Sequence, residues 1–235
     1  MQNKSFLKGL TDGLPICIGY LSVSFAFGIF AVENGFTIWQ ALVISMANVT
    51  SAGQLAAVPI IAGGGTLIEI AASQLVINSR YALMSVSLSQ KVDKSVRLID
   101  RFIISFVNTD EVFAVASGQY GNVNRNYMYG LILTPYVGWS VGTLIGAAAG
   151  NILPEIIVSA LGIAIYGMFV AIVVPPMKKE KSVFLCVAIS VLCSCLFKYV
   201  PALGNVPGGF TVIICAVLAS AVCAFLAPIK EENHG

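Results

Sequence analysis

The sequence predicts an all-α integral membrane protein with about six to eight transmembrane helices, one or two of them broken or re-entrant. Of its 235 residues, 57% are hydrophobic and only 10% are charged. A soluble domain carries about 25% charged residues, so this chain has too few to cover a surface in water. Apolar runs long enough to cross a bilayer also recur along the whole chain. We therefore expect one polytopic membrane domain over residues 1–235.

Eight apolar segments are candidate membrane segments. They are residues 13–32, 37–62, 66–89, 102–118, 127–149, 155–174, 183–199 and 207–227. The first is too long for the apolar core of a signal peptide, so we expect it to be retained as a span. Lys4 and Lys8 precede it, which favours an N-terminus on the cytoplasmic side.

The basic loop at residues 91–101 leaves two topologies open. Eight simple crossings place its four basic side chains outside the cell, against the preference of lysine and arginine for the cytoplasm. The conflict disappears if segments 37–62 and 102–118 each enter and leave on the same side, which leaves six crossings. Both segments have polar centres, and irregular backbone at membrane depth persists only where protein or water covers it.

Small residues indicate an internal twofold repeat and a close helix contact. The first and fifth segments share an order of proline and glycines: Pro15, Gly19 and Gly28, then Pro135, Gly138 and Gly146. Each half of the chain would then supply four segments, although small residues are common in every span. The fifth segment also carries glycines four residues apart, at Gly138, Gly142, Gly146 and Gly150. This stripe predicts close packing of a second helix, or alternatively a surface that slides during transport.

Segment 37–62 is interrupted by polar residues and glycine from Asn48 to Gln54, with Pro59 further on. This pattern predicts a discontinuous helix, which frees backbone groups and points helix termini at a substrate. The alternative is a continuous helix whose polar face packs on its neighbours.

Segment 66–89 carries a polar stripe and an arginine. The stripe consists of Gln74, Asn78, Tyr81 and Ser85, so this helix is expected to face a cavity or a polar neighbour. Arg80 lies about 100° away from the stripe on a regular helix. It is therefore either one half of a structural ion pair or a substrate contact.

Segment 102–118 holds Asn108, Thr109, Asp110 and Glu111 at its centre. An ionised side chain at mid-bilayer costs about 2.5–3.5 kcal/mol, so such residues usually mark a pathway or a binding site. Two adjacent carboxylates in an apolar environment are not both cheaply ionised. The pair suits a proton carrier or an ammonium-binding site; alternatively, one carboxylate simply neutralises Arg80.

Several classes of function are not expected. All six cysteines lie in apolar runs, where they are expected to pack as small apolar side chains, so we predict no metal site. The chain has no Walker A or HExxH pattern and no convincing catalytic triad, so we expect no enzyme activity and no cofactor. The net charge of +2 does not indicate nucleic-acid binding, and the lipid bilayer is the expected environment.

Several short motifs, in their order along the chain, resemble the AzlC family of azaleucine-resistance proteins, or branched-chain amino acid exporters. They are Gly13 to Pro15, Phe27-Gly28, Ser51 to Gln54, Asn78 to Tyr81, and Thr109 to Glu111. The family often has an alanine-rich sequence before the glutamine and a histidine after the arginine, where this chain has Thr50-Ser51 and Tyr81. The resemblance implies export of branched-chain amino acids and their analogues across a bacterial inner membrane, together with a small AzlD-like membrane subunit.

We therefore predict a secondary transporter for small hydrophobic amino acids that is driven by the proton gradient. The expected substrate-binding residues are Ser51, Gly53, Gln54, Asn78, Arg80 and Tyr81, and the expected coupling or ammonium-binding residues are Thr109, Asp110 and Glu111. Two alternatives remain: a channel, and a membrane scaffold or sensor in which the buried charges form a structural ion pair.

Overall fold

The computed structural model describes residues 2–150, 173–203 and 206–226, with a few isolated positions between 151 and 172. Its elements are α1 (Gln2–Glu33), α2 (Ile38–Ala47), α3 (Ser51–Ala62), α4 (Leu67–Lys91), α5 (Leu98–Phe106), α6 (Asp110–Ser117), α7 (Arg125–Gly150), α9 (Lys181–Tyr199), a 3-10 turn (Pro201–Leu203) and α10 (Gly208–Leu226). This part of the chain contains no β-strand, which confirms the predicted all-α fold. Most of the predicted span at 155–174 lies outside the described residues.

The described helices fall into two length classes. Four are long and apolar enough to cross a membrane, namely Lys4–Glu33 within α1, α7, α9 and α10. The 25 residues of α4 also reach about 37 Å, although this helix carries more charge. In contrast, α2, α3, α5 and α6 contain only 8 to 12 residues each. None of these four helices alone crosses a hydrocarbon core of about 30 Å.

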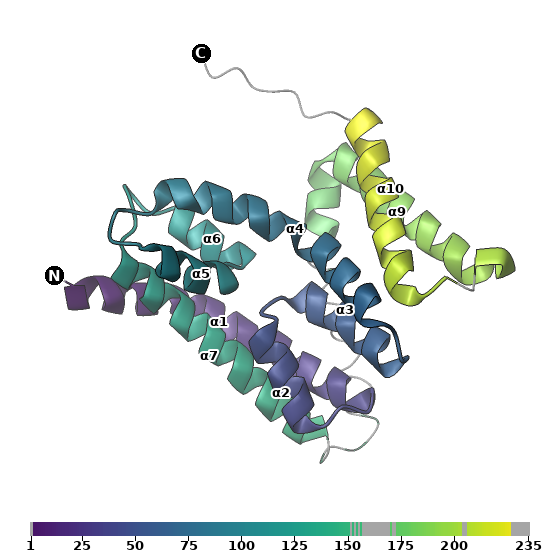
Figure 1. Cartoon of the computed structure of the whole chain (residues 1–235), viewed down its shortest axis with the longest axis horizontal. Coiled ribbons are helices and arrows are strands. Elements are labelled where there is room, and N and C mark those ends of the chain that lie inside the picture. Colours follow the sequence, from purple (N-terminus) through teal and green to yellow (C-terminus); the bar gives the residue numbers. More distant parts are fainter. Residues whose placement is uncertain are drawn as a thin grey trace.

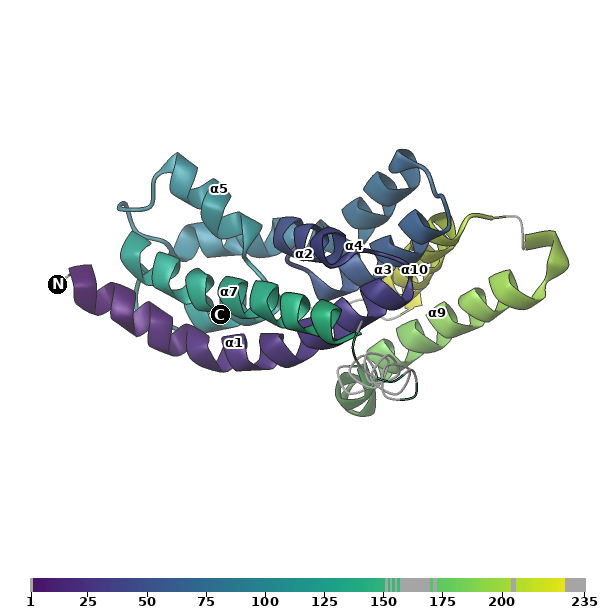
Figure 2. The ribbon, with the colours of Figure 1, turned by 90° about the horizontal axis from the view of Figure 1, so that it is seen from below.

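Helices α1 and α7 lie side by side and run in the same direction (Figures 1 and 2). Gly138 lies against Cys17 and Gly146 against Phe25, so the partners keep a constant offset of 121 residues, as parallel helices require. A Cβ atom at Gly146 would overlap the backbone carbonyl oxygen of Phe25. Glycine is therefore needed here because it lets the two backbones touch.

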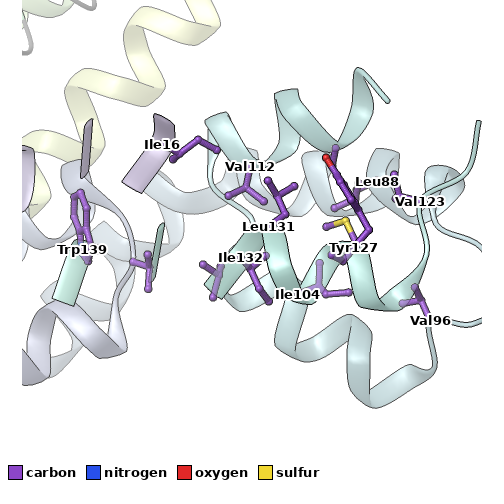
Figure 3. Packing of buried hydrophobic residues seen from close by; sticks show 14 of the residues in the cluster. Ile16, Leu88, Val96, Ile104, Val112, Val123, Tyr127, Leu131, Ile132 and Trp139 are labelled. Carbon is purple, nitrogen blue, oxygen red and sulfur yellow. The ribbon is translucent and has the colours of Figure 1, made fainter. Parts of the chain in front are cut away.

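A buried apolar cluster attaches three other helices to this pair (Figure 3). Ile104 of α5, Val112 of α6 and Leu88 of α4 are buried together with Leu131 of α7 and Ile16 of α1. Since each of these side chains is at most 9% exposed, the cluster holds the short helices α5 and α6 firmly against the long ones.

Helices α2 and α3 form a hairpin that enters and leaves at one end of the molecule. Ile38, at the start of α2, packs on the cluster that contains Ala31, near the end of α1. The other end of α2 reaches the middle of α7, where the Tyr136 hydroxyl donates to the Met46 carbonyl at 3.3 Å. Val58 of α3 is buried again in the cluster of Ala31. Segment 37–62 is thus broken, as the polar run after Ala47 predicts, and its two halves start and end at the same end of α1, as the topology with re-entrant segments requires.

Helices α5 and α6 form a second hairpin, which enters from the opposite end. Its tip also reaches Tyr136, whose ring centroid lies 6.4 Å from that of Phe106. After α6 the chain returns to the first turns of α1, where the Gln119 amide accepts a hydrogen bond from Lys8 at 2.7 Å and donates one to Asp12 at 3.3 Å. The two hairpin tips therefore meet near the middle of α7.

Helices α9 and α10 form an antiparallel pair at one side of the molecule (Figure 1). The Cys223 thiol, near the end of α10, lies 4.0 Å from the Ser182 carbonyl oxygen at the start of α9. The backbone N–H of Gly209 donates to the buried carboxylate of Glu69 at 2.7 Å. This bond attaches the start of α10 to the start of α4.

The basic loop at residues 91–101 lies at the same end of the molecule as the N-terminus. The Asp93 backbone N–H donates to the Val123 carbonyl at 2.9 Å, and Arg125 forms an ion pair with Asp100 at 2.9 Å. Both contacts place the loop beside the start of α7, which runs parallel to α1. Of the two topologies, these contacts match the one with two re-entrant segments.

Asp100 is the buried centre of this contact region. The hydrogen bond donated by the Tyr129 hydroxyl, at 2.7 Å, is the main reason that the pKa of Asp100 lies below its ordinary value. Burial opposes this shift, whereas the Arg97 backbone N–H and the charge of Arg125 reinforce it. The carboxylate thus stays ionised and holds the basic loop on α7.

The two hairpins also reveal a repeat that differs from the predicted one. In each case a long helix is followed by two short ones, as α1–α2–α3 and as α4–α5–α6, and the two units run in opposite directions. Asn48 and Asn108 occupy the two breaks, 60 residues apart, and the N-cap residues Thr37 and Arg97 have the same spacing. Such inverted repeats are common in transporter folds. The predicted four-segment halves remain a prediction, because the span at 155–174 lies largely outside the described residues.

The contact between α1 and α7 predicts that Gly146→Ala lowers stability. The added methyl group overlaps the Phe25 backbone, and overpacking of this kind typically costs about 1–3 kcal/mol. Thermal unfolding of the purified protein in detergent measures the effect. Gly150→Ala is the matched control, since its Cβ would meet Ile29 at an ordinary 3.5 Å. Equal unfolding midpoints for the two variants would contradict the described packing.

The re-entrant topology predicts the sidedness of three positions in a cysteine-free background. Cysteines at Lys4 and Lys94 should react with an impermeant thiol reagent from the same side of the membrane, and a cysteine at Ala62 from the other side. All three side chains are exposed, so access depends only on the side. Reaction of Lys4→Cys and Ala62→Cys from one side, with Lys94→Cys on the other, would instead support eight simple crossings.

Candidate functional site

A cavity of about 270 Å³ lies where the two hairpin tips meet the long helices. It is lined by residues of both helix breaks and of α1, α4 and α7: Pro15, Ile16, Gly19, Tyr20, Val23, Val49, Thr50, Ser51, Arg80, Tyr81, Thr109, Asp110, Glu111 and Trp139. Thr50 caps α3 by accepting a hydrogen bond from the Gly53 backbone N–H, whereas Thr109 occupies the N-cap position of α6 without a side-chain capping bond. The N-termini of two short helices therefore face one cavity from opposite directions.

Arg80 and Asp110 form an ion pair at 2.5 Å within this cavity. Their side chains remain 49% and 46% exposed, so the pair is accessible rather than sealed in the core. The Arg80 guanidinium also lies over the Tyr81 ring, 4.9 Å from its centroid, and donates to the Tyr81 hydroxyl at 3.2 Å. Because partly exposed ion pairs contribute only about 0–1 kcal/mol, a charged ligand competes for these groups at little cost.

Glu111 has a different partner from its neighbour Asp110. Its carboxylate accepts a hydrogen bond from the Tyr20 hydroxyl at 2.5 Å, and no cation among the described residues lies within ion-pair distance. Tyr20 is buried, whereas the Glu111 side chain is exposed to the cavity. The two carboxylates are therefore not equivalent, since a cation neutralises only one of them.

Tyr20 connects Glu111 to the opposite hairpin. Its ring packs edge-on against Trp139, with 5.0 Å between the ring centroids. The Trp139 indole N–H donates to the Gln54 side-chain carbonyl at 3.2 Å, and Gln54 is fully buried in α3. A change at Glu111 in α6 can thus act on α3 through two rigid aromatic side chains.

The first hairpin tip is held by an amide network from α4. The Gln74 side-chain oxygen accepts from Asn48 at 3.1 Å and from Asn78 at 3.0 Å, and its NH₂ group donates to the Gly53 carbonyl at 2.8 Å. A Cβ atom at Gly53 would lie 2.5 Å from the Gln74 oxygen and 2.8 Å from the Thr50 methyl group. Backbone and side-chain amides therefore replace the hydrogen bonds that the helix break removes.

At the second tip, the Asn108 amide donates to the Ser85 hydroxyl at 3.3 Å. Three buried atoms near the two tips, Nε2 of Gln54, Oδ1 of Asn78 and Oδ1 of Asn108, have no hydrogen-bond partner among the described residues. An unsatisfied buried polar group costs about 1–3 kcal/mol. Oγ1 of Thr109 is a fourth such atom, and because Thr109 lines the cavity, a polar ligand there meets an unsatisfied group.

The structure divides the predicted substrate-binding residues into two groups. Ser51, Arg80 and Tyr81 line the cavity, and so do all three predicted coupling residues, Thr109, Asp110 and Glu111. Gly53, Gln54 and Asn78 lie behind the lining. They serve as partners of Gln74 and Trp139 because the break needs internal hydrogen bonds before it can present a surface to a ligand.

The glycine stripe lies away from the cavity lining, on the face of α7 that contacts α1. A Cβ atom at Gly138 or Gly142 would clash with Cys17 or with Ser24 and Leu21, whereas one at Gly150 would fit. The stripe thus provides close contact between the two longest described helices and contributes no cavity surface.

Among the lining residues that the sequence does not single out, two aromatic residues, Tyr20 and Trp139, make side-chain hydrogen bonds. Tyr20 and Trp139 look like ordinary aromatic residues of apolar spans, and nothing in their spacing joins them to the charged residues. A usable signal was the position of Tyr20, since a buried phenol well inside a span needs a hydrogen-bond partner. Only the offset of α1 against α7 shows which partners are in reach.

Comparisons with known proteins cover all cavity residues. A family model described as AzlC protein matches residues 15–153. The inner membrane protein YgaZ of Escherichia coli K12 is 29% identical over 236 residues, which covers 97% of this chain and 91% of that protein. An uncharacterized membrane protein of Archaeoglobus fulgidus is 31% identical over 179 residues, covering 75% of this chain and 78% of the relative. No solved structure matches the chain.

The amide network predicts that Gly53→Ala disorders the first hairpin tip. Because the methyl group overlaps Gln74 and Thr50, we expect a loss of about 1–3 kcal/mol in unfolding free energy. Gly19→Ala is the control from the same cavity, as its Cβ would meet nothing within 4 Å. That control should leave stability unchanged or raise it, since alanine is favoured over glycine in a helix by about 1 kcal/mol. Thermal unfolding in detergent that ranks the variants the other way would contradict the network.

Proposed function

The chain belongs to the AzlC family, and on this premise we propose that it is a proton-coupled secondary transporter. Its substrates would be branched-chain, hydrophobic amino acids and their analogues, exported across the inner membrane. The observation that carries the proposal is the pair of accessible, opposite charges, Arg80 and Asp110, with Glu111 beside them in a cavity at the meeting point of two re-entrant hairpins.

The charges of the cavity are complementary to a zwitterion. Arg80 is suited to the α-carboxylate, because its planar guanidinium matches carboxylate geometry. Asp110, once released from Arg80, or Glu111 is suited to the α-ammonium group. Insertion of the substrate exchanges one half-exposed ion pair for two charge-assisted contacts and leaves one of the two carboxylates without a cation.

The remaining lining is suited to an aliphatic side chain. Ile16, Val23, Val49 and Trp139 supply apolar surface next to the charged residues. One methylene more or less in such a pocket is worth only about 1–3 kcal/mol. We therefore expect modest discrimination among leucine, isoleucine and valine.

Glu111 is the proposed proton carrier. It has no cation as a partner, unlike Asp110, and its bond to Tyr20 links it through Trp139 to Gln54 of the other hairpin. Protonation removes the charge that the Tyr20 hydroxyl donates to and so weakens this link. Alternating access would then consist of movements of the two hairpins, which approach the cavity from opposite ends.

The orientation follows from the basic residues. The N-terminal end of the molecule carries the basic loop at residues 91–101, Arg125, Lys4 and Lys8. The positive-inside rule assigns this end to the cytoplasm. A small AzlD-like membrane subunit is part of the proposal through the family, and α9, which buries none of its residues in the described part, leaves surface for it.

A second candidate function is a scaffold or sensor that transports nothing. The Arg80–Asp110 ion pair favours it, since a structural pair needs no ligand. The double variant Arg80→Asp with Asp110→Arg distinguishes the two. It restores a structural pair and its stability, but it does not restore the arrangement of charges around a substrate.

The transport proposal predicts distinct effects for substitutions at Glu111 and at Arg80. In proteoliposomes that contain the protein and its small subunit, Glu111→Gln should abolish export driven by a pH gradient while exchange of labelled valine persists. Arg80→Gln should reduce both activities by about 10- to 100-fold, because this factor corresponds to the loss of one charge-assisted hydrogen bond. Glu33→Gln, an exposed carboxylate outside the cavity, is the matched control.

Unchanged transport in the combined variant Asp110→Asn with Glu111→Gln would remove both the proton and the ammonium roles. Absence of valine and leucine transport by the unmodified protein, with and without the small subunit, would leave the scaffold as the better assignment.

A further inference from the structure

An apolar groove lies on the outer side of the molecule, separate from the central cavity. It has a volume of about 560 Å³ and runs between α5 and α7, with Phe6 of α1 at one end. Ile103, Phe106 and Leu133 line it and are 44%, 51% and 44% exposed. From Asn126 to Tyr136, both of which line the groove, a helix rises about 15 Å. This length equals half of a hydrocarbon core of about 30 Å, that is, one leaflet.

A polar cavity of about 520 Å³ lies at the N-terminal end of the groove. The two share Asn126, and Ser5 of the polar cavity precedes Phe6 of the groove in α1. The polar lining includes Lys94, Arg97 and Arg125. An apolar channel as long as one leaflet thus ends directly at a cluster of cations.

Two of these cations have no carboxylate within ion-pair distance among the described residues, although the charge of Arg97 helps to lower the pKa of Asp100. Arg125 pairs with Asp100 at 2.9 Å, whereas Lys94 and Arg97 are exposed and form no ion pair within the described part of the chain. One acidic residue, Asp93, also lines the cavity, against the three cations Lys94, Arg97 and Arg125. The lining therefore keeps an excess of positive charge.

We propose that this surface binds one anionic phospholipid. Lys94 and Arg97 hold the phosphate of the headgroup, and one acyl chain lies in the groove between α5 and α7. The excess positive charge favours an anionic over a zwitterionic headgroup. The apolar groove favours a lipid over a free anion. Basic pockets between helices on the cytoplasmic side of a membrane protein are suited to such headgroups, and the basic loop lies at the N-terminal end.

The lipid would also have a structural role. The groove is lined by Phe106 and Val107, at the end of α5 next to the helix break. Re-entrant backbone is stable at membrane depth only when it is covered. A resident acyl chain covers the outer side of α5 without closing the central cavity, whose lining shares no residue with the groove.

Lipid binding to the purified full-length protein tests the proposal by native mass spectrometry. The detergent-solubilised protein is titrated with phosphatidylglycerol, phosphatidylcholine or inorganic phosphate. We expect one tightly bound phosphatidylglycerol and weaker phosphatidylcholine. The double variant Lys94→Gln with Arg97→Gln should lower the affinity for phosphatidylglycerol by about tenfold or more. Lys91→Gln with Arg101→Gln, the same charge change in the same loop but outside the cavity lining, should not.

A second pair of variants tests the groove. Leu133→Trp fills it and should displace the phosphatidylglycerol, whereas Val137→Trp, also exposed on α7 but outside the groove, should leave it bound. Thermal unfolding without added lipid identifies any variant that is simply misfolded, and a misfolded Leu133→Trp is replaced by Ile103→Trp.

Several results would overturn the proposal. Equal losses of phosphatidylglycerol affinity in the two charge variants would mean that the lipid responds to the total charge of the loop and not to Lys94 and Arg97. Equal binding of phosphatidylcholine would remove the role of the cations. Inorganic phosphate that binds as tightly as phosphatidylglycerol would indicate an anion site without a lipid. A bound protein subunit in place of lipid, released by Leu133→Trp, would assign the groove to a partner helix. None of these readings depends on transport activity.

Discussion

The backbone contact between α1 and α7 is the constraint on which the rest of the structure depends. Because glycines let the backbones of α1 and α7 touch, the two helices form one rigid unit against which both hairpins pack. Their parallel direction matters as much as their proximity. A chain that leaves α1 at one end must reach the other end before α7 begins, and α4 makes this return. The two loops that flank α4 therefore lie at opposite ends, so the hairpins enter from opposite sides.

The hairpins solve a problem that they themselves create. Each break exposes backbone polar groups at a depth where no solvent satisfies them. Thr50 caps the start of α3, and Gln74 of α4 binds the Gly53 carbonyl. Hydrogen-bonding groups are thus concentrated where the chain is least regular. The same concentration makes the region receptive to a polar ligand, so structural need and the proposed function coincide at one place.

Charge in this protein is sorted by position. Near the central cavity, Asp110 has a cation as its partner and Glu111 has a phenol, and the proposed binding and proton-carrying roles follow this difference. At the N-terminal end, Asp100 neutralises Arg125, whereas Lys94 and Arg97 stay unpaired beside an apolar groove. The buried pair at Asp100 holds elements together, whereas the half-exposed pair of Arg80 and Asp110 and the unpaired cations Lys94 and Arg97 are accessible to ligands.

The sequence by itself determined the membrane fold, the two interrupted segments and all three charged residues that line the cavity. These features depend on composition and on local breaks, such as the polar run from Asn48 to Gln54. Both can be recognised in the sequence without knowing which residues are in contact in the folded protein. Only the tertiary structure decided the role of Gln54 as an internal support and the entry of Tyr20 and Trp139 into the site. It also paired Arg80 with Asp110 rather than with Glu111. The reason is that these assignments depend on the 121-residue offset of α1 against α7 and on the direction of each hairpin, and such long-range geometry leaves no periodic trace in the chain.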